Sequence, residues 1–131
     1  MNQGGSLVTL QLNLSRNSTD ESTLLKILNC CPDLISIRFE LMDITQQVGK
    51  TIGKFVNDVK LLTSVEFKYC LLRHEGMKEI ADGLVWAKKL EKFAAYACNC
   101  VNSCLTQCIS NLAFIPNLKT LDLYESTQYY F

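Results

Sequence analysis

The chain has 131 residues, 48% of them hydrophobic, and its 13 basic residues are balanced by 13 acidic ones. This is the length of one ordinary domain, with enough apolar residues for a packed core. A neutral chain gives no support to the basic face that nucleic-acid binding requires, so no nucleic-acid partner is expected. The apolar stretches are far shorter than the roughly 18 residues of a membrane span, so no membrane association is expected either.

The amino terminus and the cysteines together indicate a compartment. Residues 1–6 lack the charged region and the apolar stretch of a secretory signal. Without a signal, an odd number of cysteines is interpreted as a set of reduced thiols in a cytoplasmic protein. This interpretation would fail if the chain belonged to the ectodomain of a larger secreted protein. The seven cysteines are Cys30, Cys31, Cys70, Cys98, Cys100, Cys104 and Cys108.

An internal repeat is the main feature of the sequence. Five segments share the pattern apolar-x-x-apolar-x-apolar, and successive segments start 27, 28, 28 and 28 residues apart. The pattern predicts a short strand whose fourth and sixth positions face inward and whose fifth faces outward. Chance would not hold this register over five copies. The segments begin at Leu7, Leu34, Leu62, Leu90 and Leu118.

The second half of each unit predicts a helix. When the units are aligned, with one gap in the first, apolar residues occupy three equivalent positions. The second position follows the first by four residues and the third follows the second by three, a spacing that places all three on one face of a helix. Residues 20–22, 74–76 and 102–103 are predicted to lie at helix starts. The three apolar columns are Leu24, Ile52, Ile80 and Cys108; Leu28, Val56, Leu84 and Leu112; and Cys31, Val59, Ala87 and Ile115.

Two glycines fall inside these predicted helices. Gly53 and Gly83 each weaken a helix by about 1 kcal/mol relative to alanine. They either permit close packing against a neighbouring helix or are tolerated glycines on the surface, and the sequence leaves both readings open.

Residues 7–126 resemble the leucine-rich repeat family. The ninth position of that motif is usually Asn or Cys, and the match is mixed, because Cys70 and Cys98 agree, Ser15 and Ser126 are polar substitutes, and Met42 departs. A full helix in each unit is similar to the ribonuclease-inhibitor-like subclass. That subclass also occurs in the sensor arrays of NOD-like receptors, in Ran GTPase-activating protein and in tropomodulin.

The expected fold is therefore α/β, a leucine-rich repeat solenoid that forms a right-handed α/β horseshoe arc. Four repeats of 27 to 28 residues and a partial fifth would form one domain over residues 1–131, with parallel strands on the concave face and helices on the convex face. Neither end has the polar cap that a solenoid needs. We therefore expect a fragment of a longer array that is able to self-associate through its uncapped ends.

The concave face is the predicted binding surface. Outward positions of the five strands form two columns, the first Gln11, Arg38, Glu66, Ala94 and Asp122, and the second Asn13, Glu40, Lys68, Tyr96 and Tyr124. Tyrosines among mixed charges are typical of surfaces that bind another protein. The alternative is an ordinary surface, with the binding determinants in other repeats. The predicted binding residues are Tyr69, Tyr96 and Tyr124, with Arg38, Glu66 and Lys68 as polar specificity elements.

The resemblance implies a module that recognises a protein or a ligand, as in the sensor region of a NOD-like innate immune receptor. The alternative is a regulatory scaffold similar to Ran GTPase-activating protein or tropomodulin. A third hypothesis is an array that only spaces other domains. The partner itself is not identified by any motif.

Catalytic and metal-binding interpretations are weaker. Four cysteines in residues 98–108 would suffice for zinc, but the repeat gives Cys98 a turn position and Cys108 a core position. Residues 49–51 imitate the end of a phosphate-binding loop, yet Ile44 stands where that loop needs glycine. His74 is the only histidine and is expected in a solvated turn. No nucleophile, base and stabiliser assemble, so we predict no enzyme, no cofactor and no metal.

Overall fold

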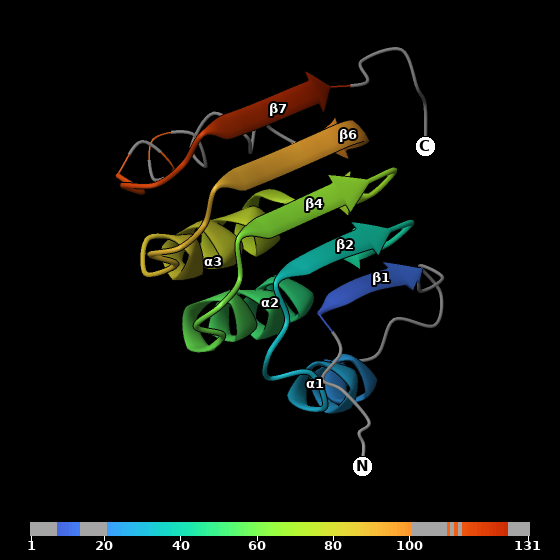
Figure 1. Ribbon diagram of the computed structural model, residues 1–131. Coiled ribbons are helices and arrows are strands. Elements are labelled where there is room, and N and C mark those ends of the chain that lie inside the picture. The colour runs from blue at the N-terminus through green and yellow to red at the C-terminus, as the bar shows by residue number, and fades with distance from the viewer. Residues whose placement is uncertain (1–7, 14–20, 101–109, 111, 113, 126–131) are drawn as a thin grey trace.

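The computed structural model describes residues 8–13, 21–100, 110, 112 and 114–125. Parallel strands lie side by side with helices against one face of their sheet, as Figure 1 shows. The main ladder runs in the order β1, β2, β4, β6 and β7, and all its pairings are parallel. These strands span Thr9–Asn13, Ser36–Glu40, Ser64–Lys68, Lys92–Cys100 and Thr120–Glu125.

The sheet register reproduces the sequence repeat. Ile37 of β2 pairs with Val65 of β4, which pairs in turn with Phe93 of β6. Each residue therefore lies beside its equivalent in the next unit. This all-parallel α/β arrangement is compatible with the predicted solenoid arc and with a leucine-rich-repeat-like fold.

A second, short ladder follows the strand ends. Here β3 (Asp43–Ile44) pairs with β5 (Leu71–Leu72), and β5 pairs with the far end of β6. Arg73 donates two hydrogen bonds to the Asp43 carboxylate, from Nε at 2.7 Å and from a terminal nitrogen at 3.0 Å. This two-point contact raises the pKa of Arg73, and it ties neighbouring units together beside the short strands.

Three helices connect the strands, α1 (Glu21–Asn29), α2 (Gln46–Asp58) and α3 (His74–Leu84). The Thr45 hydroxyl accepts a hydrogen bond from the Val48 N–H and so caps α2. His74 is the first residue of α3 rather than part of a solvated turn before it, and it is half-buried. The helix start predicted at residues 74–76 is therefore confirmed, whereas the solvated turn expected for His74 is not; Arg73 takes the N-cap position without a side-chain capping bond.

The predicted fourth helix lies mostly outside the described residues, so the count of four repeats stays a prediction. None of the helices in the described segments combines the length and the apolar character that crossing a bilayer requires.

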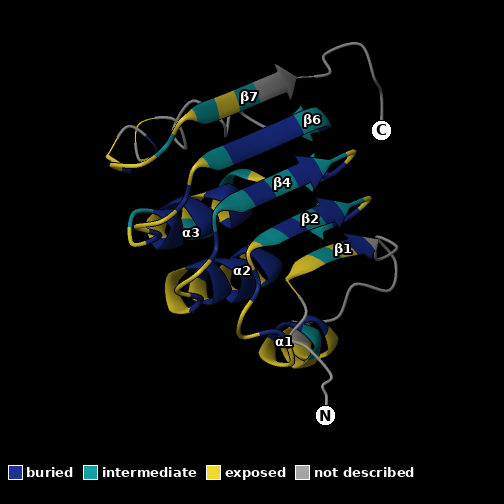
Figure 2. Cartoon of the chain, viewed as in Figure 1, coloured by how far each residue is buried: buried dark blue, intermediate teal, exposed yellow. Residues whose placement is uncertain are grey.

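The core lies between the sheet and the helices, as the burial colours of Figure 2 show. All described members of the three predicted columns are buried, and Cys108 lies outside the described residues. The first two columns lie on the helices as predicted, whereas Cys31, Val59 and Ala87 of the third column follow the ends of α1, α2 and α3. The Phe39 ring stacks on the Phe67 ring with centroids 5.2 Å apart, and the Phe93 ring packs against Phe67 in a tilted geometry with centroids 5.9 Å apart. Leu121 departs from the strand pattern at 40% exposed, because β7 is the outermost strand of the ladder.

Glycines bring α2 and α3 into backbone contact. A Cβ added at Gly49 would collide with the backbone of Gly76, and one at Gly83 would collide with the backbone of Gly53. Backbone atoms cannot move aside as a flexible side chain can. Of the two readings of Gly53 and Gly83, close packing against a neighbouring helix is therefore confirmed.

We predict that Gly53→Ala destabilises the protein by about 2 kcal/mol, because the new methyl group would force the two helix backbones apart. In an ordinary helix the same substitution would stabilise by about 1 kcal/mol, so the sign is diagnostic. Urea unfolding monitored by circular dichroism measures the change. Asn57→Ala, at an exposed position of α2, is the control and should be neutral or slightly stabilising. A stabilised Gly53→Ala variant would contradict the close approach.

Candidate protein-binding face

One face of the main ladder is free of helices in the described part of the chain, and we call it the open face. Its side chains come from alternate strand positions, because successive residues of a strand point to opposite sides. Phe39 and Phe67 point inward and are fully buried. Arg38 and Glu66, which precede them in their strands, point to the open face and are half-buried. The repeat register thus sets polar residues in rows across the strands.

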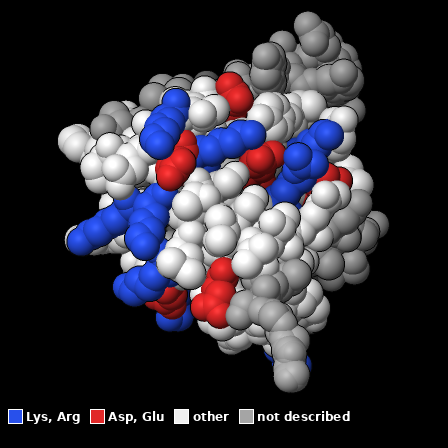
Figure 3. Space-filling model, in the orientation of Figure 1, with Lys and Arg blue, Asp and Glu red and all other residues white. Residues whose placement is uncertain are grey.

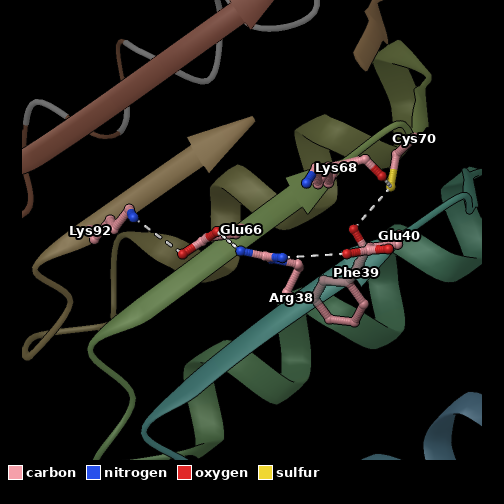
Figure 4. A network of polar contacts seen from close by, with 7 residues as sticks. All are labelled: Arg38, Phe39, Glu40, Glu66, Lys68, Cys70 and Lys92. Carbon is pink, nitrogen blue, oxygen red and sulfur yellow. Dashed lines mark hydrogen bonds and ion pairs between the residues drawn. The ribbon is translucent and has the colours of Figure 1, made fainter. Parts of the chain in front are cut away.

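Glu66 is the centre of a charge network on this face (Figure 4). Its two carboxylate oxygens lie 3.2 Å from an Arg38 guanidinium nitrogen and 3.2 Å from the Lys92 ammonium. Arg38 also contacts Glu40 at 3.4 Å. The Glu66 side chain is only 12% exposed, so this pairing is partly shielded from water. The hydrogen bond from Lys92 to Glu66 is the main cause of a raised Lys92 pKa.

Tyr96 extends the network toward β7. Its hydroxyl donates to the Asp122 carboxylate at 3.4 Å, and the Lys92 ammonium lies 6.0 Å from the centre of its ring. Tyr96 is half-buried, so its ring is held in place while part of it stays accessible. Such a fixed ring offers contact area at a low entropic cost on binding.

Tyr69 lies at the turn that ends β4 and is 45% exposed. Its backbone has a φ of 57°, and the equivalent residues Leu41 and Ala97 have φ values of 58° and 52°. This left-handed conformation costs a non-glycine residue roughly 1 kcal/mol. It lets the Leu41 N–H donate to the Lys68 carbonyl at 3.1 Å and the Tyr69 N–H donate to the Tyr96 carbonyl at 3.0 Å. The turn therefore displays Tyr69 in a fixed position.

Lys68 belongs to the same turn. Its ammonium lies 5.3 Å from the centre of the Tyr69 ring, a cation–π geometry. Among the described residues no carboxylate lies within ion-pair distance of Lys68. Lys68 and Tyr69 thus present a positive and aromatic corner beside the charge network. In Figure 3, basic and acidic side chains lie next to one another across the upper half of the view, and several basic side chains gather at its left edge.

Most of the residues predicted from the sequence come together here. Arg38, Glu66 and Tyr96 belong to the connected set of polar contacts, and Lys68 and Tyr69 form the neighbouring corner. Tyr124 pairs with Tyr96 in the strand register, but its side chain lies outside the described residues.

Two details of the face differ from the prediction. Ala94 is in the outward column yet is fully buried, because its small side chain lies among larger neighbours. Lys92 was missed, although the alternation that selected positions 94 and 96 also selects position 92. The signal was therefore present in the sequence, two residues before Ala94 in the same strand.

Three cysteines of the described part, Cys31, Cys70 and Cys98, are buried among core residues, whereas Cys30 is exposed. Cys70 and Cys98 are buried, and their thiols donate to the backbone carbonyls of Phe39 and Tyr96, each at 3.4 Å. Burial is the main cause of a raised pKa at the Cys31 thiol, with adjacent Cys30 contributing. The other candidate zinc ligands, Cys100, Cys104 and Cys108, have side chains outside the described residues. Within the described segments no group of three or more potential ligands could hold a metal ion.

Comparison with known proteins supports the fold. No family model matches this sequence, and a search of curated proteins finds no match. Among solved structures, the chain is similar to the actin-binding site 2 of leiomodin-1, with a TM-score of 0.67 and 13% sequence identity. The match covers 87% of this chain and 69% of that one. At this identity the similarity is one of fold, a leucine-rich-repeat-like arrangement of parallel strands and helices.

We predict that Glu66→Gln lowers the free energy of unfolding by about 1 kcal/mol, because Arg38 and Lys92 would face each other without the carboxylate between them. The loss should shrink as salt is added. Denaturant unfolding at several ionic strengths measures it. Glu91→Gln is the matched control, because its pair with Lys119 is long at 3.7 Å and more exposed, and it should change little. Equal effects of the two variants would contradict a special role for Glu66.

The same pair predicts a pH dependence. Because the Lys92 pKa is raised above its ordinary value of 10.5, its contribution is complete below pH 10.5 and is lost as the pH rises through the raised value. The stability difference between wild type and Glu66→Gln should therefore be steady from about pH 7 to about pH 9 and decrease above pH 10.5. If the stability difference between wild type and Glu66→Gln already decreases at pH values below about 9, Lys92 is excluded as its source.

Proposed function

We propose that this chain is a protein-binding module that recognises its partner through the open face. The observation that carries the proposal is the ordered set of paired charges and tyrosines on the helix-free side of the sheet. The proposal includes the ribonuclease-inhibitor-like form of the fold, in which four repeats have their helices on the convex side.

The pairing within the face supports a binding role. Arg38, Glu66 and Lys92 are held by one another, so they lose little additional freedom when a partner covers them. Tyrosine, the residue type of Tyr69 and Tyr96, is one of the three that are enriched among the residues that dominate interface energies. Lys68 adds a positive charge at the edge, where it would favour an acidic patch on the partner and accelerate association.

Actin is the first partner to test, because the similar solved structure is an actin-binding site. This choice agrees with the alternative of a regulatory scaffold similar to tropomodulin. No finding from the structure or the comparisons supports the sensor role in a NOD-like receptor. The proposal includes a cytoplasmic location and no enzymatic activity, and both rest on the sequence.

We expect the double substitution Tyr69→Ala with Tyr96→Ala to lower affinity for purified actin at least about tenfold, because two anchoring rings would be lost. Fluorescence anisotropy of labelled protein measures the affinity. Lys78→Ala, at an exposed position of α3, is the control and should bind like the wild type. Thermal unfolding verifies that each variant is folded.

The outcomes separate the partner from the surface. Absence of saturable binding by the wild-type chain would contradict actin as the partner. Binding that the tyrosine double variant leaves unchanged would contradict the open face as the site. Loss of binding in the Lys78→Ala control would place the contact on the helical side instead.

A further inference from the structure

A second surface lies at the opposite ends of the strands, where helices return to the sheet. A hollow of about 340 Å³ opens between the loop that leads from α2 into β4 and the loop that leads from α3 into β6. Val59, Leu62 and Ala87 are among its lining residues and are buried, so they provide an apolar floor. Trp86 lines the same hollow and is 63% exposed. We call this feature the Trp86 hollow.

The return that carries Trp86 is a tight, hydrogen-bonded turn. The backbone N–H of Trp86 donates to the Gly83 carbonyl at 3.2 Å, and the backbone N–H of Lys88 donates to the Trp86 carbonyl at 3.0 Å. The Asn117 side chain from the next unit donates to the Lys88 carbonyl at 2.7 Å. The backbone of this turn is therefore fixed by hydrogen bonds, and the Trp86 indole that it carries is exposed to water. Exposing so much apolar surface has a cost that contact with another molecule would remove.

Three lysines give the hollow its charge. Lys60, Lys88 and Lys89 also line it, and all three are exposed. The ion pairs in the described part of the chain include none of them. The nearby acids Asp58 and Glu91 are engaged elsewhere, with Lys54 at 3.0 Å and with Lys119 at 3.7 Å. The rim therefore carries positive charge that a ligand would have to complement.

We propose that the Trp86 hollow binds an acidic peptide segment of a partner protein, with an aromatic or large aliphatic side chain of that segment in the hollow. The apolar floor and the Trp86 ring would cover the inserted side chain, and carboxylates on either side of it would face the three lysines. Phe114, at the equivalent position one unit later and 78% exposed, would extend the apolar contact along the peptide.

The combination of features favours a peptide over other anionic ligands. A nucleic-acid backbone would use the lysines but would leave the apolar floor unfilled. A bilayer would take up the projecting Trp86 and Phe114 but would leave the recessed floor of Val59, Leu62 and Ala87 unfilled. A recessed apolar floor with a basic rim matches an apolar side chain flanked by acidic residues.

The only tryptophan of the chain provides a direct test. We would titrate the full chain with a short peptide that has one phenylalanine flanked by glutamates and record tryptophan emission. The expected result is a saturable blue shift, because the indole leaves water, with an affinity that weakens as salt is added. A matched peptide with lysines in place of the glutamates should give no saturable shift.

Charge reversal identifies the residues. The triple substitution Lys60→Glu, Lys88→Glu and Lys89→Glu should lower affinity for the acidic peptide at least about tenfold. Lys50→Glu with Lys78→Glu, at exposed helix positions, is the control and should leave the affinity unchanged. Circular dichroism verifies the fold of each variant.

Three results would overturn the proposal. The first is no saturable shift with the acidic peptide, and the second is an equal shift with the lysine peptide. The third is a shift with phosphatidylserine vesicles or duplex DNA but not with the peptide, which would assign the hollow to a membrane or to nucleic acid.

Discussion

The rest of the structure depends on a mismatch between two packing distances. Neighbouring strands of a sheet lie about 4.8 Å apart, whereas packed helices usually lie 8–10 Å apart. Units of one strand and one helix can satisfy both distances in two ways. Either the sheet curves so that the helices spread apart on its outer side, or the helices approach each other unusually closely. The backbone contacts of Gly49 with Gly76 and of Gly53 with Gly83 provide the second solution between α2 and α3. These glycines weaken each helix alone but let neighbouring units stack in register.

The register has a direct consequence for the open face. Since each strand residue lies beside its equivalent in the next unit, one motif position becomes one row of side chains, and the charges within a row decide whether it is stable. Arg38 is opposite Glu66, and Glu40 is opposite Lys68. Opposite charges therefore face each other across β2 and β4, and Lys92 adds a diagonal contact with Glu66. The polar groups of the face are therefore already oriented, as the proposed binding role requires.

Periodicity predicted the five strands of the main ladder, the three described helices and the buried columns, because burial in a repeat is fixed by position in the motif. It did not predict the short strands β3 and β5. It also located Arg38, Glu66 and Tyr96 on one face. It did not predict the burial of Ala94 or the charge network around Glu66, which depend on the size and reach of neighbouring side chains. The meaning of Gly53 stayed open for a similar reason, since only the structure shows what faces it. Trp86 was missed because its position in the repeat is exposed, and a pattern of buried positions selects the adjacent Ala87 instead.

The two proposed surfaces are separated by the length of a strand. Tyr69 follows the last residue of β4, whereas Trp86 lies in the return that leads into the first residues of β6. Five strand residues at about 3.3 Å each place these ends roughly 17 Å apart along the sheet. Both residues lie in turns whose backbones are hydrogen-bonded, so neither surface needs the other to be ordered. A single partner would have to extend along the strands to reach both, whereas two smaller ones could bind independently.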